Sequence, residues 1–487
     1  MSDSSESITT QHDSNSAISE TLHRSMSVWH SFTLGFAVVS PVAGLYAIIG
    51  VQTVVAGGGW FAALAVCLLM QLLVATVYAE LSSQFPIAGG AYKWARQLGG
   101  VMAGHYAGVI YICSTIAMVT TTAYTGGFWL ATFVGLPDEG GGTMVFWGAF
   151  FLLLCMLLNL APVSLFNLVI KLGVYAEVVG SFGVALILFF FFRQHPVTEL
   201  FQQLGTGTAP SEMAAFLAAL AISGWAFIGF DACSTTAEET HQPKRMVPRA
   251  IFMSLLVVGT VVLFNSAALI LAFEHDTLRH SSHTSDPVTP LIASSIGEWF
   301  EMPFLAIVMT AFLACGASMV KYTSRIVYSM AREGNMPAAL SHVTTRKTPR
   351  NAILFTVLLA GCGLVFGFND DAVATIIAFG TGGLYAMFTF TTGFALYARL
   401  TGRWNPQLGE LKLGTWGLIV NILAFIWSAF ELVNIAWPRP YAIAADAPWW
   451  QLWATPLVLG SILTSTTVYL FYQKWLNGKT THKRNAS

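Results

Sequence analysis

Long runs of apolar residues dominate this chain, and their lengths give the first prediction. A helix needs about 20 mainly apolar residues to cross a bilayer core about 30 Å thick. We predict twelve such spans, at residues 29–54, 58–81, 101–130, 143–160, 168–192, 213–233, 250–273, 303–330, 352–368, 373–397, 413–437 and 450–475. The alternation of polar and apolar residues that marks the strands of a membrane barrel is missing from the sequence. The pattern therefore predicts an all-α membrane protein with 12 transmembrane helices.

Composition agrees with this class. Only 10% of the 487 residues are charged and the mean hydropathy is +0.64, whereas soluble domains carry about 25% charged residues. The 23 Lys and Arg residues nearly balance 24 Asp and Glu residues, so no basic surface for nucleic acid is predicted. The six cysteines show neither paired nor metal-type spacing. We expect no metal and no cofactor.

Positive charges predict the orientation of the spans. If the N-terminus lies inside, all but three of the 23 Lys and Arg residues fall in inner loops or at inner helix ends, as the positive-inside rule requires. We therefore predict a multi-pass protein of the plasma (inner) membrane with both termini in the cytoplasm. The Ser/Thr-rich residues 1–27 are predicted to be a disordered N-terminus, and residues 476–487 a basic cytoplasmic tail.

Two spans contain residues that interrupt helices. Span 1 reads S-P-V-A-G, with Pro41 and Gly44 in its middle, and span 6 reads W-A-F-I-G-F-D-A, with Gly229 before Asp231. Isolated Gly and Pro residues usually only kink a membrane helix. These two spans, however, are the first members of two blocks of five spans, and transporters place their broken helices in such equivalent positions. The spacing favours two discontinuous helices over two simple kinks.

This division predicts a 5+5 inverted repeat with its binding site between the halves. The first repeat covers spans 1–5, the second covers spans 6–10, and spans 11 and 12 are peripheral. The corresponding segments are residues 28–192, 193–399 and 400–475.

Three segments resemble the amino acid–polyamine–organocation transporter superfamily. They are F-P-I-A-G-G-A-Y-K-W-A-R after span 2 (Phe85 to Arg96), W-A-F-I-G-F-D-A with the loop that follows it (Trp225 to Ile251), and S-R-I-V-Y-S-M-A-R-E-G-N-M-P after span 8 (Ser324 to Pro337). Within the superfamily the chain looks most similar to the amino acid/choline transporter branch. The resemblance implies a fold like that of the bacterial leucine transporter, with ten core helices and two peripheral ones.

The resemblance also implies a substrate site between the two breaks. Amides in the span 1 break would hold a substrate carboxylate, carbonyls in the span 6 break would hold its amino group, and Trp225 would cover the substrate. An exposed helix N-terminus suits an anion and unwound carbonyls suit a cation. The expected substrate-binding residues are Val42, Ala43, Gly44, Trp225, Phe227, Ile228 and Gly229.

Ionisable residues inside spans are costly and are therefore candidates for coupling or gating. The resemblance implies that Lys171 in span 5 stands near span 1, where its ammonium would replace a sodium ion; the alternative is that Lys171 lies too near the cytoplasmic end for this role. Glu177 would pair with a cationic substrate, carry a proton, or, as a protonated carboxyl, bond to a neighbouring helix. Asp231 would either act in coupling or cap the second half of span 6. The role of Glu431 in span 11 is left open between packing and an oligomer contact.

Charged residues at the predicted inner helix ends raise the possibility of an inner latch, and Glu239 with Arg332 is our expected pair. The alternative is interfacial charge that only follows topology.

These features predict a secondary active transporter that moves an amino acid or related amine across the membrane by alternating access. Coupling to H⁺ or Na⁺, or exchange, is expected. The chain has no nucleotide-binding G-x-x-x-x-G-K-S/T motif and no H-E-x-x-H motif, so neither an ATP-driven pump nor an enzyme is predicted. The alternatives are a choline, γ-aminobutyrate or polyamine permease of the same fold, or a non-transporting receptor or channel. The exact substrate, the coupling ion and the oligomeric state stay open.

Overall fold

The structure is a computed structural model, and it describes residues 28–136, 141–201, 207–273, 288–345, 347–368, 370–442 and 448–484. The predicted disordered segment 1–27 lies outside these residues.

Regular structure in the described part of the chain is helical. By length and hydropathy, ten helices or helix pairs can each cross a membrane. These spans are α5 (Trp60–Gln84), α6 (Ala91–Phe133), α7 (Gly141–Leu160), α8 (Val163–Glu177) with η1 (Val178–Gly183) and α9 (Val184–Phe191), α10 (Glu212–Ser223) with α11 (Ala232–Thr235), α12 (Pro243–Ala272), α15 (Glu301–Arg332), α16 (Arg350–Leu364), α18 (Trp416–Ala436) and α20 (Ala454–Arg484).

Span 1 is divided into three pieces, α2 (Val28–Val39), α3 (Pro41–Tyr46) and α4 (Ile49–Ala56), and it bends by 46° before α4. Counted as one span, it makes an eleventh candidate. The predicted tenth span falls on α17 (Asp370–Leu400), a continuous helix of 31 residues. The prediction of an all-helical, multi-pass membrane protein is confirmed, while the count of twelve spans and the inverted repeat stay predictions.

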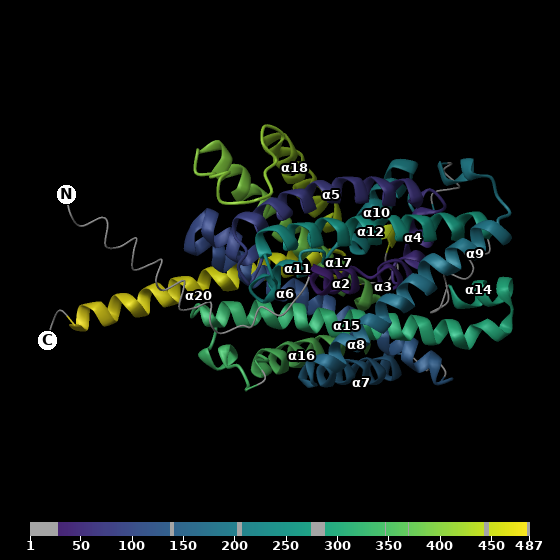
Figure 1. Cartoon of the computed structure of the whole chain (residues 1–487), viewed down its shortest axis with the longest axis horizontal. Helices are drawn as coiled ribbons and strands as arrows, with labels where there is room; N and C mark the ends of the chain where they lie inside the picture. The colour runs from purple at the N-terminus through teal and green to yellow at the C-terminus, as the bar shows by residue number, and fades with distance from the viewer. Residues whose placement is uncertain are drawn as a thin grey trace.

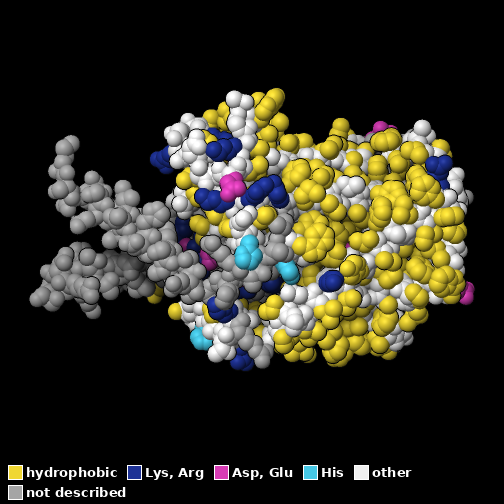
Figure 2. Space-filling model, viewed as in Figure 1, with side chains coloured by type: hydrophobic (Ala, Val, Ile, Leu, Met, Phe, Trp, Pro, Cys, Tyr) yellow, Lys and Arg dark blue, Asp and Glu magenta, His cyan; other side chains and the backbone are white. Residues whose placement is uncertain are grey.

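The long helices run side by side along the longest axis of the molecule, with α2 and α3 in the middle (Figure 1). The inner pairs are α6 with α17, α5 with α12, and α15 with both α6 and α8. α7 and α16 pack on each other and on α15. On the face that Figure 2 shows, the surface between the two ends of the bundle is mainly apolar, as expected of helices whose outer faces meet lipid tails.

α6 is longer than the sequence pattern predicts. Span 3 was expected to begin near residue 101, but the helix already begins at Ala91 and continues through a kink at Gly100, where φ is 89°. Glycine tolerates this backbone conformation, which other residues rarely adopt. The extra turns carry Lys93 and Arg96, whose charges hide the helix from a search for apolar runs.

Lys and Arg side chains gather at one end of the bundle (Figure 2). We call it the basic end: α5 and α15 end there and α6 begins there. Within it lies a nearly buried ion pair, Glu80 of α5 with Arg399 of α17, whose side chains are 2% and 9% exposed. Arg399 also donates to Asn421 of α18 at 3.1 Å, and the Leu413 amide donates to Glu80 at 3.1 Å. This cluster joins three helices.

Replacing Glu80 with Gln should destabilise the protein, because it leaves the Arg399 guanidinium buried without a counter-charge. Loss of one partner of a buried pair costs about 3 kcal/mol or more. We expect a lower Tm for the detergent-solubilised Glu80→Gln variant, with part of the loss recovered in Glu80→Gln/Arg399→Met. Glu410→Gln, at an exposed position of the adjoining loop, is the control. Equal Tm values for Glu80→Gln and the control would contradict this role.

Candidate functional site

The first break of the bundle is at Ser40. Helix α2 ends at Val39, and Ser40 takes φ 46° and ψ 108°, which is unusual for a residue other than glycine. Pro41 explains the position, because it lacks an amide hydrogen and disfavours the helical conformation in the residue before it. The Ser40 side chain then caps the new helix α3 by accepting from the Ala43 amide at 3.0 Å. The helix of span 1 is therefore interrupted at Ser40 inside the bundle, and the first amides of α3 have partners within the protein.

The second break lies in span 6. Helix α10 ends at Ser223, a 3-10 turn η3 (Gly224–Phe227) follows, and Ile228 is extended. Gly229 has φ 91°, and a side chain there would place its Cβ 2.6 Å from the Val38 Cγ1 atom. Only glycine meets both conditions. Helix α11 then begins at Ala232.

The two breaks face each other. A Cβ atom added at Gly44 of α3 would stand 3.3 Å from the Val39 carbonyl oxygen and 3.5 Å from the Ala226 carbonyl oxygen. Both carbonyls come from segments where helical hydrogen bonding ends, and such groups carry partial negative charge. The breaks thus bring main-chain acceptors from two spans to one point.

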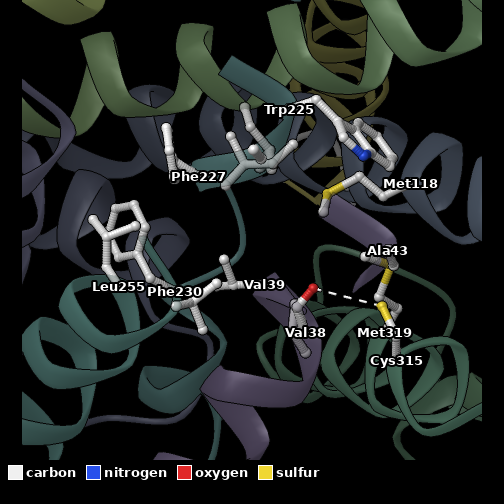
Figure 3. Packing of buried hydrophobic residues seen from close by; sticks show 14 of the residues in the cluster. Val38, Val39, Ala43, Met118, Trp225, Phe227, Phe230, Leu255, Cys315 and Met319 are labelled. Carbon is white, nitrogen blue, oxygen red and sulfur yellow. Dashed lines mark hydrogen bonds between the residues drawn. The ribbon is translucent and has the colours of Figure 1, made fainter. Parts of the chain in front are cut away.

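A small buried cavity of about 10 Å³ lies beside this point, with room for about one water molecule in this conformation. Trp225 and Met118 lie on one side of Ala43, and Met319 and Cys315 lie on the other (Figure 3). The Cys315 thiol donates to the Val38 carbonyl at 3.7 Å. The complete lining consists of Val38, Val39, Ala43, Gly44, Met118, Trp225, Ile228, Cys315 and Met319.

Most of the expected substrate-binding residues lie at this cavity. Ala43, Gly44, Trp225 and Ile228 line it, and Trp225 is 6% exposed. Phe227 is fully buried, and its side chain points away from Ala43 (Figure 3). Nothing in the sequence indicates that Met118 on α6 and Cys315 and Met319 on α15 complete the wall, because apolar residues inside spans resemble any other packing residues.

The amides of the span 1 break already have acceptors within the protein. The Val42 amide donates to Glu177 Oε2 at 2.8 Å, and the Gly44 amide donates to the Ser40 carbonyl at 2.7 Å. The Ser40 hydroxyl donates to Glu177 Oε1. Glu177, one of the three predicted coupling residues, is therefore the group that spans the break, and its bond to a neighbouring helix was among the expected alternatives.

Lys171 is placed elsewhere. Its side chain is exposed and lines a different cavity with Trp29, His30 and Lys321, between α2, α8 and α15. Lys171 is six positions before Glu177 in α8 and therefore lies nearer the basic end.

Asp231 anchors a second buried polar group next to the break. Its Oδ2 atom accepts from the hydroxyl of Tyr111 on α6 and, at 2.8 Å, from that of Tyr322 on α15. The two hydroxyls are 2.9 Å apart. The side chain of Asp231 makes no capping hydrogen bond to α11, so the capping alternative is wrong: the tyrosine hydroxyls take its oxygen instead. Nothing in the sequence pattern indicates that these two tyrosines bind Asp231.

Ion pairs cover the basic end beyond Asp231. Arg332 binds both carboxylate oxygens of Glu238, at 2.9 and 3.0 Å, and Arg325 binds Glu239 at 2.9 Å. The expected pair of Glu239 with Arg332 is therefore wrong, because the 3-10 turn at residues 237–239 points the two adjacent glutamates at different arginines. Glu333 contacts both Lys93 and Arg96 of α6.

The groups around Glu238 lower the pKa of its carboxyl group. Burial alone would raise its pKa, but the hydrogen bonds and charge of Arg332, the Ala88 amide and the charge of Lys93 together lower the pKa below its ordinary value of 4.5. The carboxyl is therefore ionised throughout the neutral range.

Glu431 lies in α18, apart from both breaks. It is buried and accepts from the Asn434 side chain at 3.2 Å. This contact is within one helix and agrees with a packing role.

The comparisons with known proteins agree with this arrangement. Residues 27–462 match the sequence profile of the family described as amino acid permease. The chain is 24% identical to the amino-acid permease BAT1 of Arabidopsis thaliana, over 94% of this chain and 93% of that protein. It is 27% identical to the glutamate/serine transporter AimA of Bacillus subtilis, over 83% and 74% of the two chains.

A third relative has a different printed substrate. The choline transporter of Saccharomyces cerevisiae is 23% identical over 87% of this chain and 78% of its own. The profile match covers most of the sequence, and these relatives are all transporters. The chain therefore belongs to the amino acid permease family of the amino acid–polyamine–organocation transporter superfamily.

Proposed function

We propose that this protein is a secondary active permease that carries a small amine or amino acid across the plasma membrane by alternating access. One observation carries the proposal: the Val39 and Ala226 carbonyls from two broken spans converge at Gly44, beside a cavity bordered by Trp225. Broken helices that meet in this way are how transporters place charged substrate groups inside a membrane. A continuous helix bundle has no such free acceptors.

In this proposal the carbonyls and the amides of the site bind different parts of the substrate. The carbonyls of Val39 and Ala226 receive the amino group of the substrate, and the Trp225 ring covers it. A substrate carboxylate reaches the amides of Val42 and Ala43 only by displacing Glu177 and Ser40 from them.

Two layers close the path from the site to the basic end. The first is Asp231 with Tyr111 and Tyr322, and the second is the set of ion pairs around Arg332. We place the basic end in the cytoplasm, because inner segments of membrane proteins are rich in Lys and Arg. Both termini then lie inside, and the two layers form the inner gate.

The finer architecture belongs to the same proposal. Twelve spans, with spans 1–5 and 6–10 as inverted repeats, would put the two breaks at equivalent positions on either side of the site. Coupling to H⁺ or Na⁺ would act through Glu177 or Asp231, which hold the two breaks to neighbouring helices. Lys171 faces a separate cavity and is less well placed for this role.

Uptake into proteoliposomes tests the function. The purified protein should accumulate at least one labelled member of a panel of amino acids, choline, γ-aminobutyrate and polyamines, and imposed H⁺ and Na⁺ gradients should identify the coupling ion. Trp225→Ala should reduce uptake about tenfold or more by raising KM, because the site loses its aromatic wall. Trp416→Ala, at an exposed position of α18, serves as the control. Absence of uptake across the whole panel would leave a receptor as the better hypothesis.

Gly44→Ala should weaken substrate binding while the protein still folds. The added methyl group would stand 3.3 to 3.5 Å from the carbonyl oxygens proposed to receive the amine. It would therefore occupy the position of the substrate without disturbing the packing of the core. We expect KM to rise about tenfold, and more for Gly44→Val. Gly460→Ala, where an added Cβ meets no atom within 4 Å, should leave KM unchanged. An unaltered KM in Gly44→Ala would remove these carbonyls from the site.

Glu238→Gln should loosen the inner gate. Because the pKa of Glu238 is lowered, its contribution to the closed gate is present above pH 4.5 and is lost as pH falls through the lowered pKa. A cysteine at position 234 (Ser234→Cys, in a background without other cysteines) should be alkylated from the inner side a few-fold faster in the variant at pH 7, as expected for a partly exposed ion pair worth about 1 kcal/mol.

Glu298→Gln is the control for this measurement, because Glu298 is exposed at the opposite end of α15. In the protein with Glu238 intact, the alkylation rate relative to free cysteine should stay constant from pH 8 to pH 5. Equal rates for Glu238→Gln and Glu298→Gln would exclude the latch.

A further inference from the structure

The start of α3 carries its own anion. Glu177 of α8 accepts from the Ser40 hydroxyl with one carboxylate oxygen and from the Val42 amide with the other, while the Ala43 amide is bound by Ser40 Oγ. Glu177 is only 2% exposed and Ser40 is fully buried. The position at which an amino acid substrate would place its carboxylate is therefore filled by a side chain of the protein.

The hydrogen-bonding pattern fits an ionised Glu177. Both of its oxygens accept a hydrogen bond, one from the Ser40 hydroxyl and one from the Val42 amide, so neither oxygen needs a proton of its own to be paired. No ion pair joins it to a basic side chain among the described residues. Lys171 of α8 and Lys321 of α15 line a different cavity, which lies nearer the basic end.

The cavity itself offers acceptors and polarisable surface. Its main-chain contribution is the converging carbonyls of Val39 and Ala226. Its side chains are apolar except for the indole N–H of Trp225 and the Cys315 thiol, which already donates to the Val38 carbonyl. The Trp225 indole and two methionine thioethers complete the wall, and aromatic rings and soft sulfur atoms accommodate an alkylammonium group well. No Lys, Arg or His is among the lining residues, so a free carboxylate would find no counter-charge.

From these observations we infer that the site selects an organic cation without a free carboxylate, an alkylamine or a quaternary ammonium compound. Glu177 supplies from inside the protein the negative charge that a zwitterionic amino acid would bring with it. The carbonyls, the Trp225 ring and the nearby Glu177 carboxylate, which has no counter-charge, all attract a bound cation. A zwitterion, in contrast, must desolvate its own carboxylate beside that of Glu177. This inference rests on the proposed permease function and narrows its substrate class.

Matched pairs of compounds test the inference. Putrescine and ornithine differ by one carboxylate, and choline and glycine betaine differ by a hydroxymethyl group in place of a carboxylate. Initial uptake and competition should be measured for all four with the full-length protein in proteoliposomes. We expect the carboxylate-free member of at least one pair to bind about tenfold or more tightly, because its partner buries an unpaired charge.

Glu177→Gln is the informative variant. The amide keeps the size of the side chain and an oxygen for the Val42 amide, but removes the negative charge. The preference for the carboxylate-free compound should fall about tenfold. Glu431→Gln removes another buried carboxylate, away from both breaks, and should leave the preference unchanged.

Three outcomes are distinguishable. Preference for ornithine and betaine over their partners overturns the inference but leaves the permease function intact. A preference for the cation that is equal in the native protein and in Glu177→Gln overturns the assignment of the charge to Glu177. Absence of uptake and competition by all four compounds and by the amino acid panel contradicts both the inference and the proposed function.

Discussion

Main-chain polar groups that leave a helix inside a membrane must find their partners within the protein, because lipid offers none. At Ser40 this constraint is met by three groups: the serine hydroxyl, the serine carbonyl and the carboxylate of Glu177. The last of these comes from a helix 137 residues further along the chain. The break in span 1 thus fixes the position of α8 as well as its own shape.

The same constraint shapes the helix that supplies Glu177. A π-helical segment, Val178–Gly183, begins directly after that residue, and such widened turns are frequent at functional sites. Within it the Gly180 carbonyl accepts from the Tyr46 hydroxyl of α3 at 3.3 Å. A side chain at position 180 would come within 2.5 Å of Ile307. The π turn and its glycine therefore let α8 approach both α3 and α15.

The sequence predicts the helices well, since their lengths follow from bilayer thickness, and it predicts both breaks from Pro41 and Gly229, whose backbone preferences are local. It does not predict which side chains bind each other in the folded protein. Ser40 and Glu177 meet only through tertiary packing, and Arg332 takes Glu238 rather than Glu239 because of the local turn. The sequence leaves the position of Lys171 open for a related reason. The apolar run of span 5 continues past it on both sides, so the pattern does not tell how far this residue lies from the break.

The ion pair that joins helices of the bundle is more buried than the ion pairs of the proposed inner gate. Glu80 and Arg399, 2% and 9% exposed, are enclosed between α5, α17 and α18, where separating them would leave two desolvated charges. The pairs made by Arg325, Arg332 and Glu333 have side chains 11% to 31% exposed. Partly hydrated pairs of this kind contribute only about 1 kcal/mol each.

The sum of the weak pairs is a few kcal/mol, which is the range in which a binding event can shift a conformational equilibrium. A gate built from buried pairs like that of Glu80 would cost far more to open, because water does not reach the separated charges. The partly exposed pairs therefore suit the proposed inner gate, which would open and close, and the buried pair suits a fixed junction between helices.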